Sequence, residues 1–154
     1  MDLSLPFVGL NINGEDICLV DSATTHIILK NKKYFTNLKI IEATITTISG
    51  NIKIIEGSGR ASILLPRWTK LTINDVLLST KSKRNLLSFK DIRQNGYHVE
   101  TMNENNIEYL YIASNVSGKK CVLEKLLAFS FGLYYTNIST IEVHDTMNQK
   151  FINS

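Results

Sequence analysis

Short runs of Ile, Leu, Val and Thr alternate with turn residues along most of this chain of 154 residues. Apolar and other residues alternate from Val8 to Ile12, and the pair Asn13-Gly14 separates this run from Ile17 to Val20. Asn-Gly favours the type I′ turn of a tight hairpin, because both central residues of that turn need a positive φ. The pattern therefore predicts a first β-hairpin whose second strand ends at Asp21.

Similar patterns predict further strands along the chain. Residues 43–48 and 52–55 flank a turn at Ser49-Gly50-Asn51, and Gly57-Ser58-Gly59 then indicates a bend or a bulge. The remaining strand-like runs, the first two joined at Pro66-Arg67-Trp68, are residues 61–65, 71–78, 97–102, 107–112, 119–123 and 133–136. Many short strands at regular spacing favour an all-β barrel or sandwich.

One short helix is predicted after Ser88. Asp91 follows Ser88 at the spacing of a capping box, and Asn95-Gly96 offers a C-terminal stop. We expect a lead-in at residues 1–6, a single domain at residues 7–140 and a polar tail at residues 141–154.

The composition indicates a folded domain and limits its partners. Apolar residues make up 44% and charged residues 20% of the chain, and the net charge of +3 is too small to indicate nucleic-acid binding by itself. Cys18 and Cys121 lack a metal-ligand spacing, and Cys18 is expected to be a small buried hydrophobe. We find no signal-peptide or membrane-span pattern, so we expect an intracellular, cytoplasmic protein with no membrane partner, metal or cofactor.

The acid at the end of the first hairpin has two interpretations. Asp21 and Ser22 are residue types that favour turns, because their side chains bond to nearby backbone N–H groups. Alternatively, Asp21 is a catalytic carboxylate. Aspartic-protease chemistry needs two carboxyl groups that share a proton, so one candidate per chain would require a symmetric dimer.

Four segments, in order, carry a resemblance to a known family. NINGEDICLVDSATTHIILKNKKYF resembles the catalytic hairpin of a retropepsin-type aspartic protease, in the form found in copia-class LTR retrotransposon Pol polyproteins. TISGNIKIIEGSGRASILL resembles the flap region and the strand after it, and LTINDVLLSTKSKRNLLSFKDIRQNGYHVE resembles the stretch with an Asn-Leu-Leu-Ser motif before a short helix. KCVLEKL and GLYYTNIS resemble the closing strands. The resemblance covers roughly residues 7–140 and implies a retropepsin-like β-barrel of hairpins with one short helix.

The resemblance assigns expected roles by position. Asp21 matches the catalytic Asp, and Ser22 matches the hydroxyl residue that braces the two active-site loops across the dimer. Gly50 falls in the flap, which closes over the peptide. Leu86 and Leu87 occupy the apolar motif that packs beneath the active-site loop.

Two neighbouring positions depart from the family pattern. Ala23 stands where the family has Gly, and Thr24 stands where it has Ala. Gly at the first position lets the backbone pass close to the partner loop and the substrate, and a Cβ can crowd that approach. His26 recurs in the family, but we expect a surface or hydrogen-bonded residue there and not a catalytic one.

The sequence therefore supports a main hypothesis and two alternatives. The main one is an aspartic endopeptidase domain of a retrotransposon Pol polyprotein, a homodimer that cleaves polyprotein peptides and would reside in a virus-like particle if the element is active. The second is a catalytically inactive β-barrel remnant with an interaction role, which Ala23 favours. The third is a nucleic-acid-binding barrel, suggested by the basic run from Lys81 to Arg84. We expect that run to be a solvated loop, and nucleic acid is not an expected direct partner.

Overall fold

The computed structural model describes residues 16–46, 50 and 52–141, and within them the chain forms one ten-stranded sheet with a short α-helix and a 3-10 helix. The helical segments are α1 (Phe89–Gln94) and the 3-10 turn Lys32–Tyr34. The strands are β1 (Ile17–Asp21), β2 (Ile28–Leu29), β3 (Phe35–Thr46), β4 (Ile52–Leu64), β5 (Lys70–Leu78), β6 (Asn85–Ser88), β7 (His98–Glu104), β8 (Ile107–Val116), β9 (Lys119–Ser130) and β10 (Leu133–Asn137).

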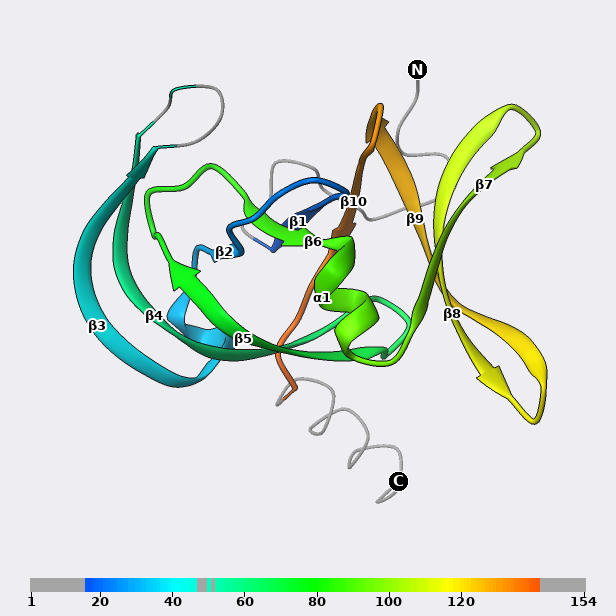
Figure 1. The fold of residues 1–154 in the computed structure, drawn as a ribbon, viewed down its shortest axis with the longest axis horizontal. Coiled ribbons are helices and arrows are strands. Elements are labelled where there is room, and N and C mark those ends of the chain that lie inside the picture. The colour runs from blue at the N-terminus through cyan, green and yellow to red at the C-terminus, as the bar shows by residue number, and fades with distance from the viewer. Residues whose placement is uncertain (1–15, 47–49, 51, 142–154) are drawn as a thin grey trace, which may run out of the picture.

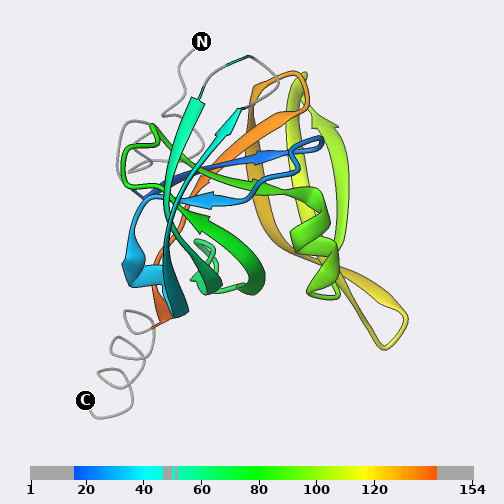
Figure 2. The same ribbon diagram turned by 60° about the vertical axis from the view of Figure 1, so that its left-hand side comes forward.

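The sheet is open but strongly curled. Its strand order is β3-β4-β5-β2-β6-β1-β10-β9-β8-β7, so β3 and β7 are the edges (Figures 1 and 2). The curl brings the end of β4 to the segment just after β10, where Leu64 and Ser139 exchange backbone hydrogen bonds of 2.8 and 2.9 Å. The all-β prediction is confirmed, and this bridge between the end of β4 and the segment after β10 completes the barrel-like curvature.

Most predicted strands and turns are present, and several strands are longer than expected. The hairpin β4–β5 turns at Pro66-Arg67-Trp68, as predicted, whereas β3 already begins at Phe35 and β9 continues to Ser130. The short strands β2 and β6 were not predicted as strands. Each is defined by neighbours from distant parts of the chain, so local periodicity carries no signal for it.

The predicted first hairpin can be described only in its second strand, which ends at Asp21 as predicted. Its first strand, residues 8–12, lies outside the described residues. Its second strand, β1, is paired along one edge with β10 in antiparallel orientation and along the other with β6 in parallel orientation. The described neighbours of β1 therefore come from the middle and the end of the chain.

Two glycines in β4 allow a close approach of β3. A Cβ at Gly59 would lie 1.8 Å from the backbone oxygen of Asn37, and a Cβ at Gly57 would lie 2.8 Å from a methyl group of Leu38. The register between β4 and β5 also shifts between Gly59 and Ala61. This irregularity next to Gly59 confirms the predicted bend or bulge.

The predicted helix α1 begins and ends at the expected residues. The Ser88 backbone N–H and hydroxyl group donate to the Asp91 carboxylate at 3.0 and 2.8 Å, within the predicted capping box. At the other end, the Gly96 N–H donates to the Arg93 carbonyl at 2.9 Å, and Gly96 has a φ of 89°. Glycine adopts this conformation without the steric strain of a Cβ.

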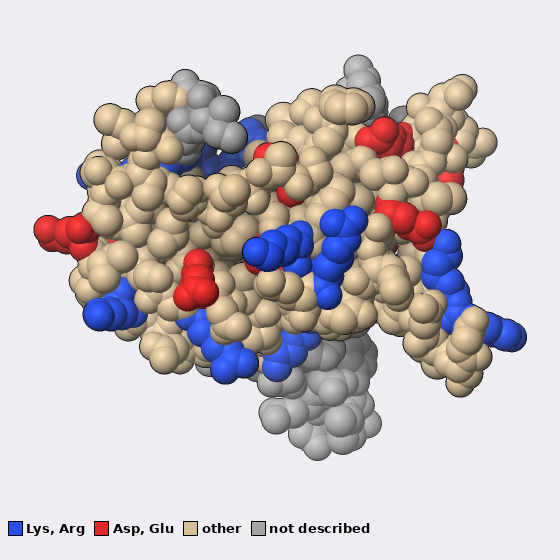
Figure 3. Space-filling model, viewed as in Figure 1, with Lys and Arg blue, Asp and Glu red and all other residues tan. Residues whose placement is uncertain are grey.

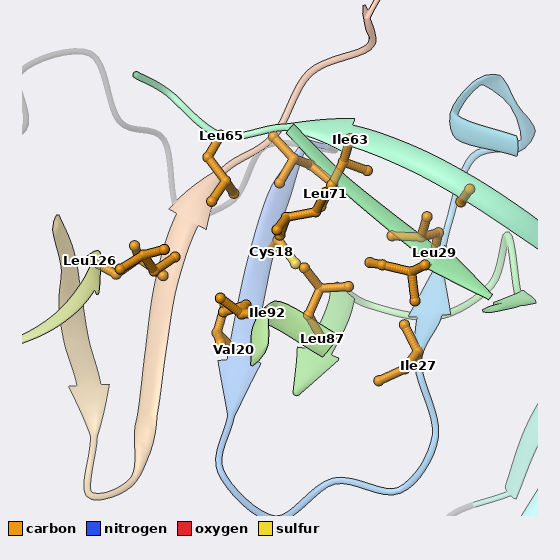
Figure 4. Close-up of a cluster of buried hydrophobic side chains, with 14 of the residues drawn as sticks. Cys18, Val20, Ile27, Leu29, Ile63, Leu65, Leu71, Leu87, Ile92 and Leu126 are labelled. Carbon is orange, nitrogen blue, oxygen red and sulfur yellow. The ribbon is translucent and has the colours of Figure 1, made fainter. Parts of the chain in front are cut away.

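The main core lies inside the curl of the sheet (Figure 4). Alternate residues of β1 point to opposite sides, so Cys18 and Val20 enter this core while Ile17 and Leu19 join a second cluster on the other face. Cys18 is fully buried, as predicted, and burial raises the pKa of its thiol. Cys18 and the exposed Cys121 are both free thiols.

The predicted domain boundaries fall largely outside the described residues. Residues 1–6 are not described, and only Ile141 of the predicted tail is. Among the helices of the described segments, none combines the length and apolar character of a membrane span.

A buried carboxylate holds the turn between β4 and β5. The Glu124 side chain on β9 is 1% exposed and accepts hydrogen bonds from the backbone N–H groups of Arg67 at 3.0 Å and Thr69 at 3.2 Å. Burial raises the pKa of the Glu124 carboxyl group, and these hydrogen bonds oppose that shift only in part. Trp68, within this turn, has a φ of 71°.

We predict that Glu124 makes stability fall as the pH rises. Because the folded pKa is raised, the folded state holds the proton more tightly than the unfolded state does, so stability is lost as the pH rises through the carboxyl range. The Glu124→Gln variant keeps a carbonyl acceptor but lacks this titration. The difference in the free energy of unfolding, wild type minus variant, should therefore be smaller at about pH 7 than at about pH 4.

Urea unfolding monitored by Trp68, the single tryptophan of the chain, measures this difference. Glu42→Gln removes an equal charge from an exposed position on β3 and is the matched control. A Glu124→Gln difference that is constant or grows with pH would contradict the assignment.

Candidate functional site

The candidate site lies at the end of β1, where a loop of residues 22–27 crosses the end of β6 and enters β2. Strand β6 lies between β1 and β2, parallel to β1 and antiparallel to β2. In this register Val20 is opposite Leu87 and Asp21 is opposite Ser88. Figure 4 shows the chain leaving β1 beyond Val20 and returning through Ile27. The structure thus brings the predicted Asp21 loop beside the predicted Leu86-Leu87 motif.

A buried asparagine ties the two strands that flank the loop. Asn85, which is 0% exposed, donates from its side-chain amide to the Ile17 carbonyl at 2.9 Å. Its side-chain oxygen accepts from the Lys30 backbone N–H at 2.8 Å. One side chain from β6 therefore fixes the start of β1 and the end of β2, which sets where the loop begins and returns.

Asp21 is half-buried and is oriented by its own turn. The Ala23 backbone N–H donates to Oδ1 of Asp21 at 2.9 Å. This hydrogen bond does not involve Oδ2. The Ser22 N–H donates to the Gly132 carbonyl at 3.3 Å, so the turn between β9 and β10 lies against the loop. Within the described part of the chain the exposed Ser22 hydroxyl group has no hydrogen-bond partner. The turn-forming interpretation is therefore realised, and it leaves one carboxylate oxygen accessible.

The residues after Ser22 form a polar, self-contained loop. Ala23 is exposed and is not among the positive-φ residues of the described chain, so its methyl group introduces no backbone strain. The Thr24 hydroxyl group donates to the His26 carbonyl at 3.2 Å, and the Thr25 hydroxyl group lies 3.1 Å from Nδ1 of His26. His26 is exposed and hydrogen-bonded, as expected.

The predicted flap can be described only at Gly50 and at the strands on either side. Gly50 has a φ of 85°, which glycine adopts readily, and residues 47–49 and 51 lie outside the described residues. The first residues of β4 nevertheless reach the Asp21 side of the sheet. Lys53 of β4 shares a hollow of about 330 Å³ with Leu19 of β1 and Leu86 of β6.

This hollow contains residues that sequence reasoning did not single out. Leu19 precedes Asp21 by two residues and so faces the same side of β1, a relation that strand alternation could have indicated. Phe129 lines the hollow from β9, and Lys53 lines it from β4. These two residues come from strands distant in sequence, so no local pattern links them to Asp21.

The arrangement presents one carboxylate at the end of β1. Within the loop of residues 22–27 and its flanking strand ends, Asp21 supplies the carboxylate. Over the described residues, no group of three or more His, Cys, Asp or Glu side chains is placed to hold a metal ion. Two copies of Asp21 brought together would complete the centre that acid–base hydrolysis needs.

A comparison with protein-family models identifies one family. The model described as the β-barrel domain of the Pol polyprotein matches residues 18–97, just over half of the chain. The match begins in β1 and ends just after α1, so it includes the Asp21 loop, Gly50 and the Leu86-Leu87 motif. Neither a curated protein nor a solved structure matches the chain.

We predict that Asn85→Ala destabilises the protein by about 2 to 4 kcal/mol, because it leaves the Ile17 carbonyl and the Lys30 N–H without this partner. Backbone amides of residues 22–27 should also exchange faster. Chemical denaturation and hydrogen exchange measure the two effects. Asn103→Ala, on the exposed edge strand β7, should change stability by less than about 0.5 kcal/mol. Equal effects of the two substitutions would refute the bracing role.

Proposed function

This chain belongs to the Pol polyprotein β-barrel domain family, and from that premise we propose that it is an aspartic endopeptidase domain that acts as a homodimer. Each copy would contribute Asp21 to a shared dyad. One carboxylate would take a proton from a water molecule while the other, protonated, would donate a hydrogen bond to the scissile carbonyl. Attack of that water on the carbonyl carbon, followed by proton transfer to the leaving nitrogen, hydrolyses the peptide bond.

The observation that carries the proposal is the parallel pairing of β1 with β6. Asp21 and the Leu86-Leu87 motif are far apart in sequence but lie on neighbouring strands of the sheet. Asp21 is opposite Ser88, and Asn85 braces the loop at both ends. This is the arrangement that the resemblance to retropepsin-type proteases implies. A brace of this kind limits the movement of a catalytic loop, which acid–base chemistry requires.

The contacts of the loop also support an approach by a second copy. Phe131, in the turn between β9 and β10, is fully exposed, and its neighbour Gly132 accepts the hydrogen bond from the Ser22 N–H. A large apolar side chain thus projects from a turn that touches the Asp21 loop. A two-fold axis close to Asp21 would place this turn at the interface, where burial of Phe131 would be favourable.

The first test is the acid itself. We predict that the wild-type chain cleaves peptides of a mixed library at mildly acidic pH, and that Asp21→Asn reduces the rate at least about 100-fold. Mass spectrometry of the products measures the cleavage. Asp75→Asn, at an exposed position of β5, should leave the rate unchanged. Cleavage that survives Asp21→Asn would disprove the mechanism, and a dimer that cleaves nothing would favour the inactive β-barrel with an interaction role.

The second test is dimerisation. We predict that Phe131→Ser raises the dimer dissociation constant about 10- to 100-fold, because each copy loses one aromatic side chain that the proposed interface would bury. Sedimentation velocity over a range of protein concentrations measures this constant. Val116→Ser removes an exposed apolar residue from the end of β8, where the chain turns toward β9, and should have no effect. A wild-type chain that stays monomeric at the highest concentration would rule out the shared dyad.

A further inference from the structure

A basic groove adjoins the Asp21 strand on the side of the predicted flap. It consists of two neighbouring hollows of about 330 and 360 Å³, which share Lys53, Ser82 and Lys83 as lining residues. One wall is the beginning of β4, and the other is the segment of residues 79–84 that leads into β6. In Figure 3, basic side chains lie in a hollow at the upper left of the view.

Four basic side chains gather in the groove. Its basic residues are Lys53, Lys81, Lys83 and Arg84, and the lining residues of the two hollows include no Asp or Glu. Lys53 donates to the Ser82 hydroxyl oxygen at 3.4 Å, and the guanidinium group of Arg84 lies 5.4 Å from the centre of the Phe129 ring. Among the described residues none of these four cations forms an ion pair. The nearby Glu56 carboxylate on β4 accepts hydrogen bonds from the Thr80 hydroxyl group at 2.6 and 2.9 Å.

The floor of the groove is apolar and continuous with the candidate site. Leu19 and Leu86 are opposite each other in the β1–β6 pair, and Phe129 and Ile28 complete the floor. Asp21 and Ser88 form the pair two residues further along the same strands, on the same face and about 7 Å away. A peptide whose scissile bond lay at Asp21 would therefore place a neighbouring side chain on this floor and the next ones between the cations.

We propose that this groove selects peptide segments in which an Asp or Glu lies one to three residues from a large apolar side chain. The apolar side chain would cover Leu19, Leu86 and Phe129, and the carboxylate would pair with Lys53 and Lys83. The inference rests on the proposed function for the identity of the ligand as a substrate peptide. A carboxylate between Lys53 and Lys83 would be attracted by both ammonium groups, which would make the groove selective by charge.

The apolar floor distinguishes this groove from a nucleic-acid site. Single-stranded nucleic acid is bound along basic grooves whose aromatic side chains stack on successive bases. Here Phe129 is the one aromatic residue lining the two described hollows, and it already packs edge-on against Tyr135. The aliphatic floor residues suit an amino-acid side chain better than a base.

The test measures binding by the Asp21→Asn protein, so that it does not depend on cleavage. Fluorescent peptides of about ten residues are compared in pairs that differ only by Glu or Gln beside a Leu or Phe. We expect the Glu peptide to bind about tenfold more tightly, and we expect Lys53→Glu with Lys83→Glu to abolish or reverse this preference. Lys90→Glu with Lys119→Glu changes the net charge equally at exposed positions outside the groove. This control should preserve the preference for the Glu peptide.

The outcomes separate this inference from the proposed function. Equal binding of the Glu and Gln peptides would overturn the inference even if the wild type cleaves peptides. An equal loss of the Glu preference in the two double variants would overturn it as well. A charge preference in a chain that cleaves nothing would sustain the inference as a binding specificity and disprove the enzyme. Tighter binding of an oligonucleotide of about twenty nucleotides, lost in Lys53→Glu with Lys83→Glu, would overturn it in favour of a nucleic-acid ligand.

Discussion

The insertion of β6 between β1 and β2 is the constraint on which the site depends. The two strands are joined by a loop of residues 22–27, yet they are not neighbours in the sheet, because β6 separates them. A buried Asn85 satisfies one backbone group on each side, and leaving those groups unpaired would be unfavourable in a dry interior. The loop is therefore held at both ends, and Asp21, at the end of β1, is opposite Ser88, the residue before α1.

The long β3–β4 hairpin extends this arrangement into a groove. Gly59 lets β4 pass so close to Asn37 that no side chain fits between the strands, and beside it the pairing of β4 with β5 shifts register. Strand β4 contacts two separate regions of the molecule. Its end bonds to Ser139 near β10, while its beginning at Lys53 reaches the hollow beside Leu19. The groove therefore depends on the course of β4, along which Gly59 permits the close approach to Asn37.

Local chemistry in the sequence predicts the turns and caps, and it does not predict which distant strands pair. The capping box at Ser88, the turn at Pro66-Arg67-Trp68 and the burial of Cys18 all follow from neighbouring residues. The pairing of β1 with β10 does not, because it joins residues more than a hundred positions apart. The same holds for the site. The Asp21 loop is visible as a motif, whereas the groove is assembled from segments that share no local pattern.

The methyl group of Ala23 bears on the candidate chemistry only where two copies meet. Within one chain Ala23 is exposed, has no positive φ, and uses its backbone N–H to orient the Asp21 carboxylate. Glycine would supply the same N–H and would add only conformational freedom that this turn does not use. Because the fold accommodates the methyl group without strain, in the proposed dimer it would act through the distance of closest approach between the two loops. Ala23→Gly should therefore alter dimer affinity and cleavage together while leaving the stability of the single chain nearly unchanged.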